Sequence, residues 1–251
     1  RSQPNGPEAI TIVATDHGFD LPGRVPAGTT TFRLVNRGAA LHHAQLALIQ
    51  DGKTLDDVNA VLATGALPDF VVWAGGPGIV APGGEASVTL SLRAGTYVWL
   101  CFVVTPGDHA PHLAQGMVKP MVVEGGARGE LPDADNTLML TDYDFKLGRE
   151  LTAGPQVLRV RNYAAQPHEV VIARLAPGKS AQDLLDWLMA GEQGPPPALP
   201  SGGMQGLSQG MAGNVELELT PGEYALLCFI PDAKDGQPHV AHGMVKQVTV
   251  R

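Results

Sequence analysis

The chain contains only two cysteines in 251 residues, Cys101 and Cys228, and aromatic residues make up just 5% of it. Positive charge is also scarce, because Lys and Arg total 17 against 25 Asp and Glu, which gives a formal net charge of −8. Nucleic-acid binding relies on clustered cations and stacking aromatics, so we predict no nucleic-acid partner. No apolar run approaches the roughly 18 residues of a membrane-spanning helix, so we predict no transmembrane segment.

The most informative pattern is an internal repeat. In each half an asparagine precedes a histidine by six positions, and a cysteine is later followed, after ten intervening residues, by His-x4-Met. The two cysteines are 127 residues apart, too far for a solenoid repeat, whose units span about 20–50 residues. The period therefore indicates a duplicated domain. The repeated residues are His42, Cys101, His112 and Met117 in the first half, and His168, Cys228, His239 and Met244 in the second.

One thiolate, two imidazoles and one thioether form the ligand set of a blue-copper electron-transfer site. The repeat therefore predicts up to two copper ions, one held by each set of four residues. The two cysteines occupy equivalent positions of separate repeats, and a disulfide would need their Cα atoms within about 7 Å of each other. We therefore predict that Cys101 and Cys228 are metal ligands and do not form a disulfide.

Short runs rich in Val, Leu, Thr and aromatics, bounded by Gly, Pro, Asn or Asp, predict β-strands throughout both halves. Each half also has one predicted helix, at Thr54–Thr64 and at Ser180–Ala190, the latter with a Ser cap. Long Gly/Pro-rich stretches at Pro68–Gly84 and Gly191–Gly213 do not have the pattern of core segments. They are expected to cover an end of a barrel or the interface between domains.

This organisation predicts an all-β chain made of two tandem antiparallel β-sandwiches or barrels, each with one short helical insertion. The first domain is expected at residues 1–125, and the second at 136–251. A Gly-rich linker without periodicity, residues 126–135, separates them. The predicted strands are Ala9–Ala14, Thr30–Val35, Ala44–Ile49, Ala86–Leu92, Thr96–Phe102, Val118–Val123, Thr137–Leu140, Gln156–Arg161, Glu169–Arg174, Val215–Leu219, Glu223–Phe229 and Val245–Val250.

The sequence resembles the cupredoxins, the blue-copper fold. In that family the first His follows a strand that ends in a Val-Asn type sequence, as Asn36 and Asn162 do here. The Cys closes a strand after a Gly-x-Tyr turn, matching Gly95 to Tyr97 and its repeat, and a His and a Met follow. The resemblance covers nearly all of residues 9–250 and implies Greek-key topology, type 1 copper and single-electron transfer with a redox partner protein.

Three features depart from the family pattern. Ten residues separate Cys from the second His, whereas small cupredoxins use two to four. The residue after the first His is His43 or Glu169 where the small proteins usually have Asn. Multicopper oxidases and nitrite reductases place a His directly before the Cys, whereas this chain has Leu100 and Leu227. The missing histidines favour an electron carrier over an oxidase or nitrite reductase.

Two other functions stay open at this point. The chain could be a binding or structural module that kept the fold and changed the use of its copper loops. It could also be an oxidoreductase with a catalytic copper at a domain or subunit interface. The remaining histidines are expected on the surface, with an interdomain metal site as the alternative: His17, His43, His109 and His242.

The chain starts at Arg1 with neither an initiator Met nor a signal sequence. This start is what a processed or a trimmed form of a longer chain would have. With the cupredoxin resemblance, we expect an extracytoplasmic protein, periplasmic or secreted, from which the signal peptide has been removed. The sequence identifies neither the redox partner nor the oligomeric state.

Overall fold

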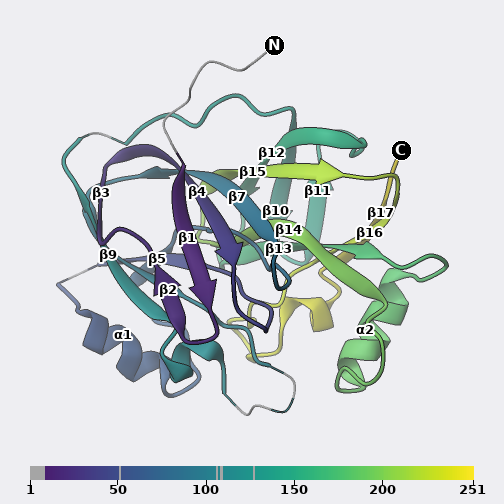
Figure 1. Ribbon diagram of the computed structural model, residues 1–251, viewed down its shortest axis with the longest axis horizontal. Helices are drawn as coiled ribbons and strands as arrows, with labels where there is room; N and C mark the ends of the chain where they lie inside the picture. The colour runs from purple at the N-terminus through teal and green to yellow at the C-terminus, as the bar shows by residue number, and fades with distance from the viewer. Residues whose placement is uncertain (1–8, 51, 106, 108–109, 127) are drawn as a thin grey trace.

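The computed structural model describes residues 9–50, 52–105, 107, 110–126 and 128–251, and it is mostly β-structure. Two short α-helices, α1 and α2, lie at opposite lower corners of the molecule (Figure 1). No helix in the described part of the chain is long and apolar enough to cross a membrane.

The first half contributes two groups of paired strands. Strand β1 pairs in parallel with β4, and β4 pairs antiparallel with β7. The second group has β8 at its centre, between β9 and β5. The elements are β1 (Ile10–Thr15), β2 (Gly18–Asp20), β3 (Arg24–Pro26), β4 (Gly28–Asn36), β5 (Gln45–Ile49), α1 (Leu55–Leu62), β6 (Val71–Trp73), β7 (Glu85–Leu92), β8 (Gly95–Leu100), the 3-10 helix η1 (His112–Gln115) and β9 (Val118–Glu124).

The second half repeats this arrangement. Strand β10 pairs in parallel with β12, and β12 pairs antiparallel with β15, while β13 and β16 form the centre of a separate four-stranded sheet. The elements are β10 (Asn136–Thr141), β11 (Asp144–Leu147), β12 (Gly154–Asn162), β13 (His168–Leu175), α2 (Ala181–Met189), β14 (Ala198–Leu207), β15 (Ala212–Leu219), β16 (Gly222–Leu227), the 3-10 helix η2 (His239–His242) and β17 (Val245–Val250).

The two halves share one sheet. Strands β7 and β15 pair antiparallel and join the halves into an eight-stranded sheet in which Val88 lies opposite Val215. These two valines are 127 residues apart, which is also the spacing of the cysteines, so equivalent residues meet at the centre of the junction. The largest apolar cluster contains residues of both halves, among them Leu90 and Met204. The halves are therefore not independent cores.

Both α-helices begin as their sequences predict. Thr54 and Ser180 cap α1 and α2, and each forms a capping box with the Asp three residues later. Val58 of α1 is buried against an apolar cluster of the first half, and Leu184 of α2 is buried in the equivalent cluster of the second. Each helix thus covers one face of the sheet that contains the strand directly before the cysteine, β8 or β16.

The Gly/Pro-rich stretches differ from the expectation that they are not core segments. They contain strands β6 and β14, and Trp73, Ala74, Met204 and Leu207 are buried. Isolated bridges pair Ala74 with Leu207 and Pro77 with Met204 across the halves. These stretches were expected to cover a barrel end or the interface between domains. They lie at the interface between the halves, and they also contribute to the core.

Candidate metal centres

A buried asparagine fixes the segment that carries the first histidine of each site. The Asn36 side-chain amide donates to the backbone oxygens of Ala40 (2.8 Å) and Val80 (3.0 Å). Val80 in turn exchanges backbone hydrogen bonds with His42. In the second half Asn162 makes the equivalent pair of bonds, both at 2.8 Å. The asparagine noted six residues before each histidine thus ties the histidine loop to a neighbouring segment.

The other ligand candidates of each site come from one loop between two paired strands. Cys101 follows β8, and its backbone oxygen accepts from Leu113 (2.8 Å) within η1. His112 donates its backbone N–H to Val103, and Met117 donates to His112 (3.0 Å). The equivalent bonds recur in the second half. The ten-residue spacing between Cys and His is therefore accommodated in both halves, and the loop returns the histidine to the cysteine.

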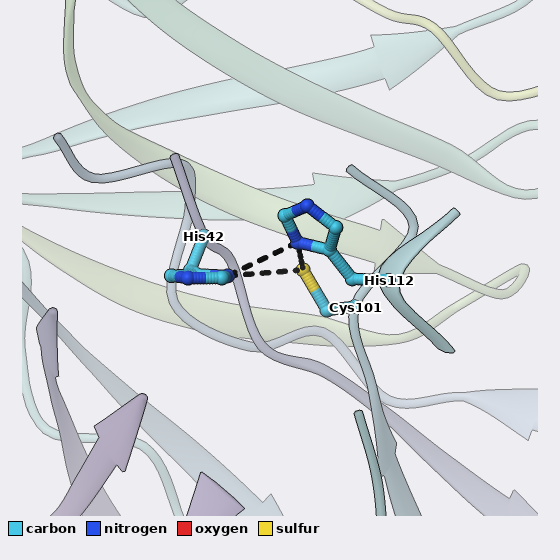
Figure 2. A group of neighbouring side chains, drawn as sticks. All are labelled: His42, Cys101 and His112. Carbon is cyan, nitrogen blue, oxygen red and sulfur yellow. Dashed lines mark hydrogen bonds between the residues drawn. The ribbon is translucent and has the colours of Figure 1, made fainter. Parts of the chain in front are cut away.

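In the first half the three side chains His42, Cys101 and His112 converge (Figure 2). The Cys101 Sγ lies 3.9 Å from His42 Nδ1 and 3.6 Å from His112 Nδ1, and the two Nδ1 atoms are 3.1 Å apart. All three residues are buried. The sequence-predicted residues of this site are thus brought together with the same ring atom of each histidine facing the sulfur.

The second half has the same arrangement. Cys228 Sγ lies 3.9 Å from His168 Nδ1 and 3.3 Å from His239 Nδ1. The histidine rings are tilted by 43° with centroids 4.4 Å apart. All three residues are buried, and no disulfide joins Cys101 to Cys228, as predicted.

An aspartate sets the orientation of the first histidine in each site. Asp16 lies 3.0 Å from His42 Nε2, and Asp142 lies 3.0 Å from His168 Nε2. Backbone N–H groups of Ala39 and Ala40 together with His42 lower the pKa of Asp16 to about 2, so this group is a carboxylate and can only accept. The proton of the histidine therefore resides on Nε2, and Nδ1 presents its lone pair toward the cysteine, as a metal ligand must.

The distances also fit one ion between the three side chains. Bonds of about 2.0 Å to nitrogen and 2.3 Å to sulfur, at angles of roughly 100–130°, put N···N at about 3.1–3.6 Å and N···S at about 3.3–3.9 Å. The separations of 3.1, 3.6 and 3.9 Å around Cys101 fall within these ranges. A trigonal His2Cys set is the donor arrangement of a blue-copper site.

The two sites differ at the outer face of the second histidine. Thr105 Oγ1 lies 2.7 Å from His112 Nε2, whereas Asp232 Oδ2 lies 3.7 Å from His239 Nε2. His239 Nε2 has no hydrogen-bond partner among the described residues, so its interaction with Asp232 is Coulombic. Tyr143 donates a hydrogen bond to Asp232 (2.5 Å), and the carboxylate has a pKa well below its usual range. These residues were not predicted, although Thr105 and Asp232 occupy equivalent repeat positions.

Burial raises the pKa of the Cys101 thiol to about 11. It raises the pKa of Cys228 further, with the nearby Glu169 carboxylate as a second cause. A thiolate at either position therefore requires a compensating positive charge, which a metal cation between the side chains supplies.

The residue after each first histidine is buried, which corrects the expectation that His43 lies on the surface. His43 Nε2 accepts the backbone N–H of Phe102 (3.0 Å), and the Glu169 carboxylate accepts that of Phe229 (2.9 Å). Burial lowers the pKa of His43 to about 3 and raises that of Glu169 to about 7. Both residues thus hold the backbone directly after the cysteine.

Met117 and Met244 are fully buried, and the backbone oxygen of each accepts from the cysteine of its own site at 3.3 Å. Gly116 and Gly243 precede them with φ of 111° and 90°, a left-handed conformation that favours glycine and ends each 3-10 helix. The backbone therefore keeps each methionine beside its site, and an axial role for the sulfur stays a prediction.

The remaining predicted features lie outside these clusters. His17 and His242 are exposed, as expected, and His109 lies outside the described residues. Leu100 and Leu227, which precede the cysteines, are buried. His242 Nε2 lies 3.2 Å from Asp235 on the surface of the second half.

Comparison with known proteins gives structural matches only. No protein-family model matches the sequence, and no curated protein matches it. Auracyanin A, a "blue" copper protein from Chloroflexus aurantiacus, is 25% identical with a TM-score of 0.31, over 47% of this chain and all of that chain (100%). Auracyanin from Roseiflexus castenholzii is 24% identical with a TM-score of 0.30, over 46% of this chain and 95% of that chain.

A copper nitrite reductase from Nitrosomonas europaea is 15% identical with a TM-score of 0.26, over 96% of this chain and 92% of that chain. Because all three TM-scores are low, the chemistry assigned to this chain rests on the ligand geometry described above. Each of the two His-Cys-His sites of this chain resembles a type 1 copper site in its set of donor atoms.

Proposed function

We propose that this chain is a tandem two-domain cupredoxin that transfers single electrons through two type 1 copper sites. The domains are residues 1–125 and 136–251, each a Greek-key β-sandwich, with residues 126–135 as the linker. The observation that carries the proposal is the duplicated, buried convergence of two histidine Nδ1 atoms on one cysteine sulfur. The proposed ligands are His42, Cys101, His112 and Met117, and His168, Cys228, His239 and Met244.

Copper bound in such a site supplies a one-electron Cu(II)/Cu(I) couple. The protein's part is to hold the ligand positions before the metal arrives. Asp16 and Asp142 fix the histidine tautomers, and Asn36 and Asn162 fix the histidine loops. Because the ligands are buried and restrained, their geometry changes little between oxidation states, and a small change in geometry favours rapid electron transfer.

The test is loading with Cu(II), followed by metal analysis and an optical spectrum. Two equivalents of copper and a strong thiolate-to-copper charge-transfer band are expected. Cys101→Ser and Cys228→Ser should each retain one equivalent and part of the band, and the double variant should retain neither. Colourless protein without stoichiometric copper contradicts the proposal.

A catalytic copper at an interface is the competing function, and turnover separates it from electron carriage. Leu100 and Leu227 occupy the positions where copper oxidases and nitrite reductases have a histidine. The copper-loaded protein should therefore give no sustained turnover with nitrite or phenols. Turnover abolished by replacement of His17 or His242 would favour the interfacial site.

We further propose an extracytoplasmic location, periplasmic or secreted, with a separate redox protein as the electron partner. The resemblance to blue copper proteins supports this location. Fractionation of the native host, with detection by antibody, tests it, and recovery of the protein only from the cytoplasmic fraction contradicts it.

A further inference from the structure

Tyr143 has a backbone conformation that few bulky residues adopt. It lies in the tight turn between β10 and β11, where Thr141 pairs with Asp144. Its φ is 62°, in the left-handed region, and Glu192 is the only other non-glycine residue with a positive φ in the described part of the chain. Such a conformation costs free energy for a large side chain, and it persists where the surrounding structure holds it, often at functional sites. The equivalent turn of the first half has His17, so the fold itself does not require a tyrosine.

The hydroxyl of Tyr143 anchors this turn to the loop of the second metal centre. It donates a hydrogen bond to Asp232 Oδ2 at 2.5 Å, and Gln166 Nε2 donates to the same oxygen at 3.1 Å. Asp232 is buried and belongs to the loop between Cys228 and His239. The ring of Tyr143 is therefore held in one place relative to His239.

The ring of Tyr143 contacts both a buried histidine and an exposed one. It meets the His239 ring edge-on, with centroids 5.8 Å apart and an interplanar angle of 75°. It meets the His242 ring at 5.3 Å with a tilt of 43°. Both separations are within the range of about 4.5–7 Å found for interacting aromatic rings. His239 is fully buried, Tyr143 is half-buried and His242 is exposed, so the three rings form a series from a proposed copper ligand to the surface.

A protein partner cannot touch His239 directly, because the side chain has no exposed surface. An electron that travels between His239 and the surface must therefore tunnel through intervening atoms. The probability of tunnelling falls steeply with distance, and more steeply across gaps than through packed or bonded atoms. The competing route to His242 follows the backbone of η2, and the two ring contacts of Tyr143 shorten this path.

We propose that Tyr143 is the electron port of the second metal centre, the residue through which an electron passes between His239 and the surface at His242. This role rests on the proposed copper function. On oxidation, one electron leaves Cu(I), which becomes Cu(II), and reduces a one-electron acceptor at the surface; a one-electron donor reverses the step. The ring transmits the electron without being oxidised, so no bond forms or breaks and the Tyr143 hydroxyl keeps its proton.

The experiment is flash photolysis of the Cys101→Ser protein, loaded with one copper and labelled with a ruthenium polypyridyl complex on the imidazole of His242. Peptide mapping identifies the fraction labelled there. Photogenerated Ru(III) takes an electron from the copper, and the thiolate-to-copper band of the Cys228 site reports the transfer. Tyr143→Leu removes the ring and should slow this transfer severalfold, whereas Tyr143→Phe keeps the ring and should retain the parent rate. The optical spectrum and reduction potential are measured in each protein, so that rates are compared at equal driving force.

The control is Tyr163→Leu, which replaces an exposed tyrosine of the second half and should leave the rate unchanged. The melting temperature of each metal-free variant shows whether it folds as the parent does. Asparagine tolerates the left-handed conformation, so Tyr143→Asn is a second variant without the ring and should be slowed in the same way.

A parent rate in the folded variants that lack the ring overturns the port and assigns the transfer to the backbone of η2. Equal slowing in Tyr143→Phe and Tyr143→Leu also overturns it, because the hydroxyl contact with Asp232 would then carry the effect. A Cys101→Ser protein without the charge-transfer band contradicts the proposed function and with it the port. An intact band with an unchanged rate contradicts the port alone.

Discussion

Thr105 and Asp232 occupy the same position in the two repeats, four residues after the cysteine, and each faces Nε2 of the second histidine of its site. Thr105 presents a hydroxyl at 2.7 Å, and Asp232 presents a carboxylate at 3.7 Å. The carboxylate adds negative charge beside the imidazole and stabilises the more positive Cu(II) state. The second site should therefore have a lower reduction potential than the first.

Exchanging the residue types at positions 105 and 232 tests whether they set the difference in reduction potential between the two sites. Asp232→Thr should raise the potential of the second site, and Thr105→Asp should lower that of the first, each by tens of millivolts. A tenfold change in relative Cu(II) and Cu(I) affinity is about 59 mV for one electron. Redox titration of single-site proteins, made by replacement of the other cysteine with Ser, measures each potential. Unchanged potentials in both exchanges would show that these residues do not tune the metal.

The ligand residues could be predicted from the sequence because chemistry restricts them to few residue types and the repeat gives their positions twice. The residues around the ligands were harder to predict from the sequence. Neither Thr105 nor Asp232 has a sequence signal of its own, since hydroxyls and carboxylates are common in loops. His43 was placed wrongly on the surface because a single histidine beside another polar residue has no periodicity to mark it as buried.

Strands β6 and β14 were missed for a different reason. Gly76 and Gly203 have φ of 143° and 135°. A Cβ at Gly76 would collide with the backbone oxygen of Ala44, and one at Gly203 with that of Val170. These glycines permit a close backbone approach within each half, of Gly76 to Ala44 and of Gly203 to Val170, but in the sequence they indicate loops. The shared eight-stranded sheet could not be predicted from the sequence either, because β7 and β15 have ordinary strand patterns that do not specify a partner.

The buried asparagine of each half should be necessary for stability. Asn36→Ala removes an amide that donates to two backbone oxygens and leaves them without that partner. We expect a loss of about 1–3 kcal/mol in the free energy of unfolding, with weaker copper binding. Asn162→Ala should behave in the same way, and Asn59→Ala on the exposed face of α1 serves as the control. Urea denaturation measures the change, and a loss equal to that of the control would contradict the structural role.

Metal binding should release protons, because the raised pKa values keep the cysteine thiols protonated in the metal-free protein. Cys101 has a pKa of about 11 in the metal-free protein, so at pH 6–8 the thiol is protonated and a metal must displace its proton. Binding should release one proton per site from the cysteine. Affinity should then increase about tenfold per pH unit over this range.

Titration with Co(II), which does not oxidise thiols, in weakly buffered solution measures this release. The Cys101→Ser, Cys228→Ser double variant is the control and should release no thiol proton. Affinity that is independent of pH would show that the cysteines are not ligands.

The axial role of the methionines is tested by Met117→Gln. The new side chain has a similar length and offers an oxygen in place of the thioether, and the axial ligand mainly tunes the potential of a blue-copper site. The variant should keep its copper, lower the reduction potential of the first site and shift its visible spectrum, as measured in the Cys228→Ser background.

Met117 is fully buried, so a core role would have a different signature. A lower melting temperature with an unchanged spectrum and an unchanged reduction potential would identify Met117 as a packing residue. Met117→Leu, which keeps the volume and removes the sulfur, separates the two roles, because it should preserve stability and raise the potential.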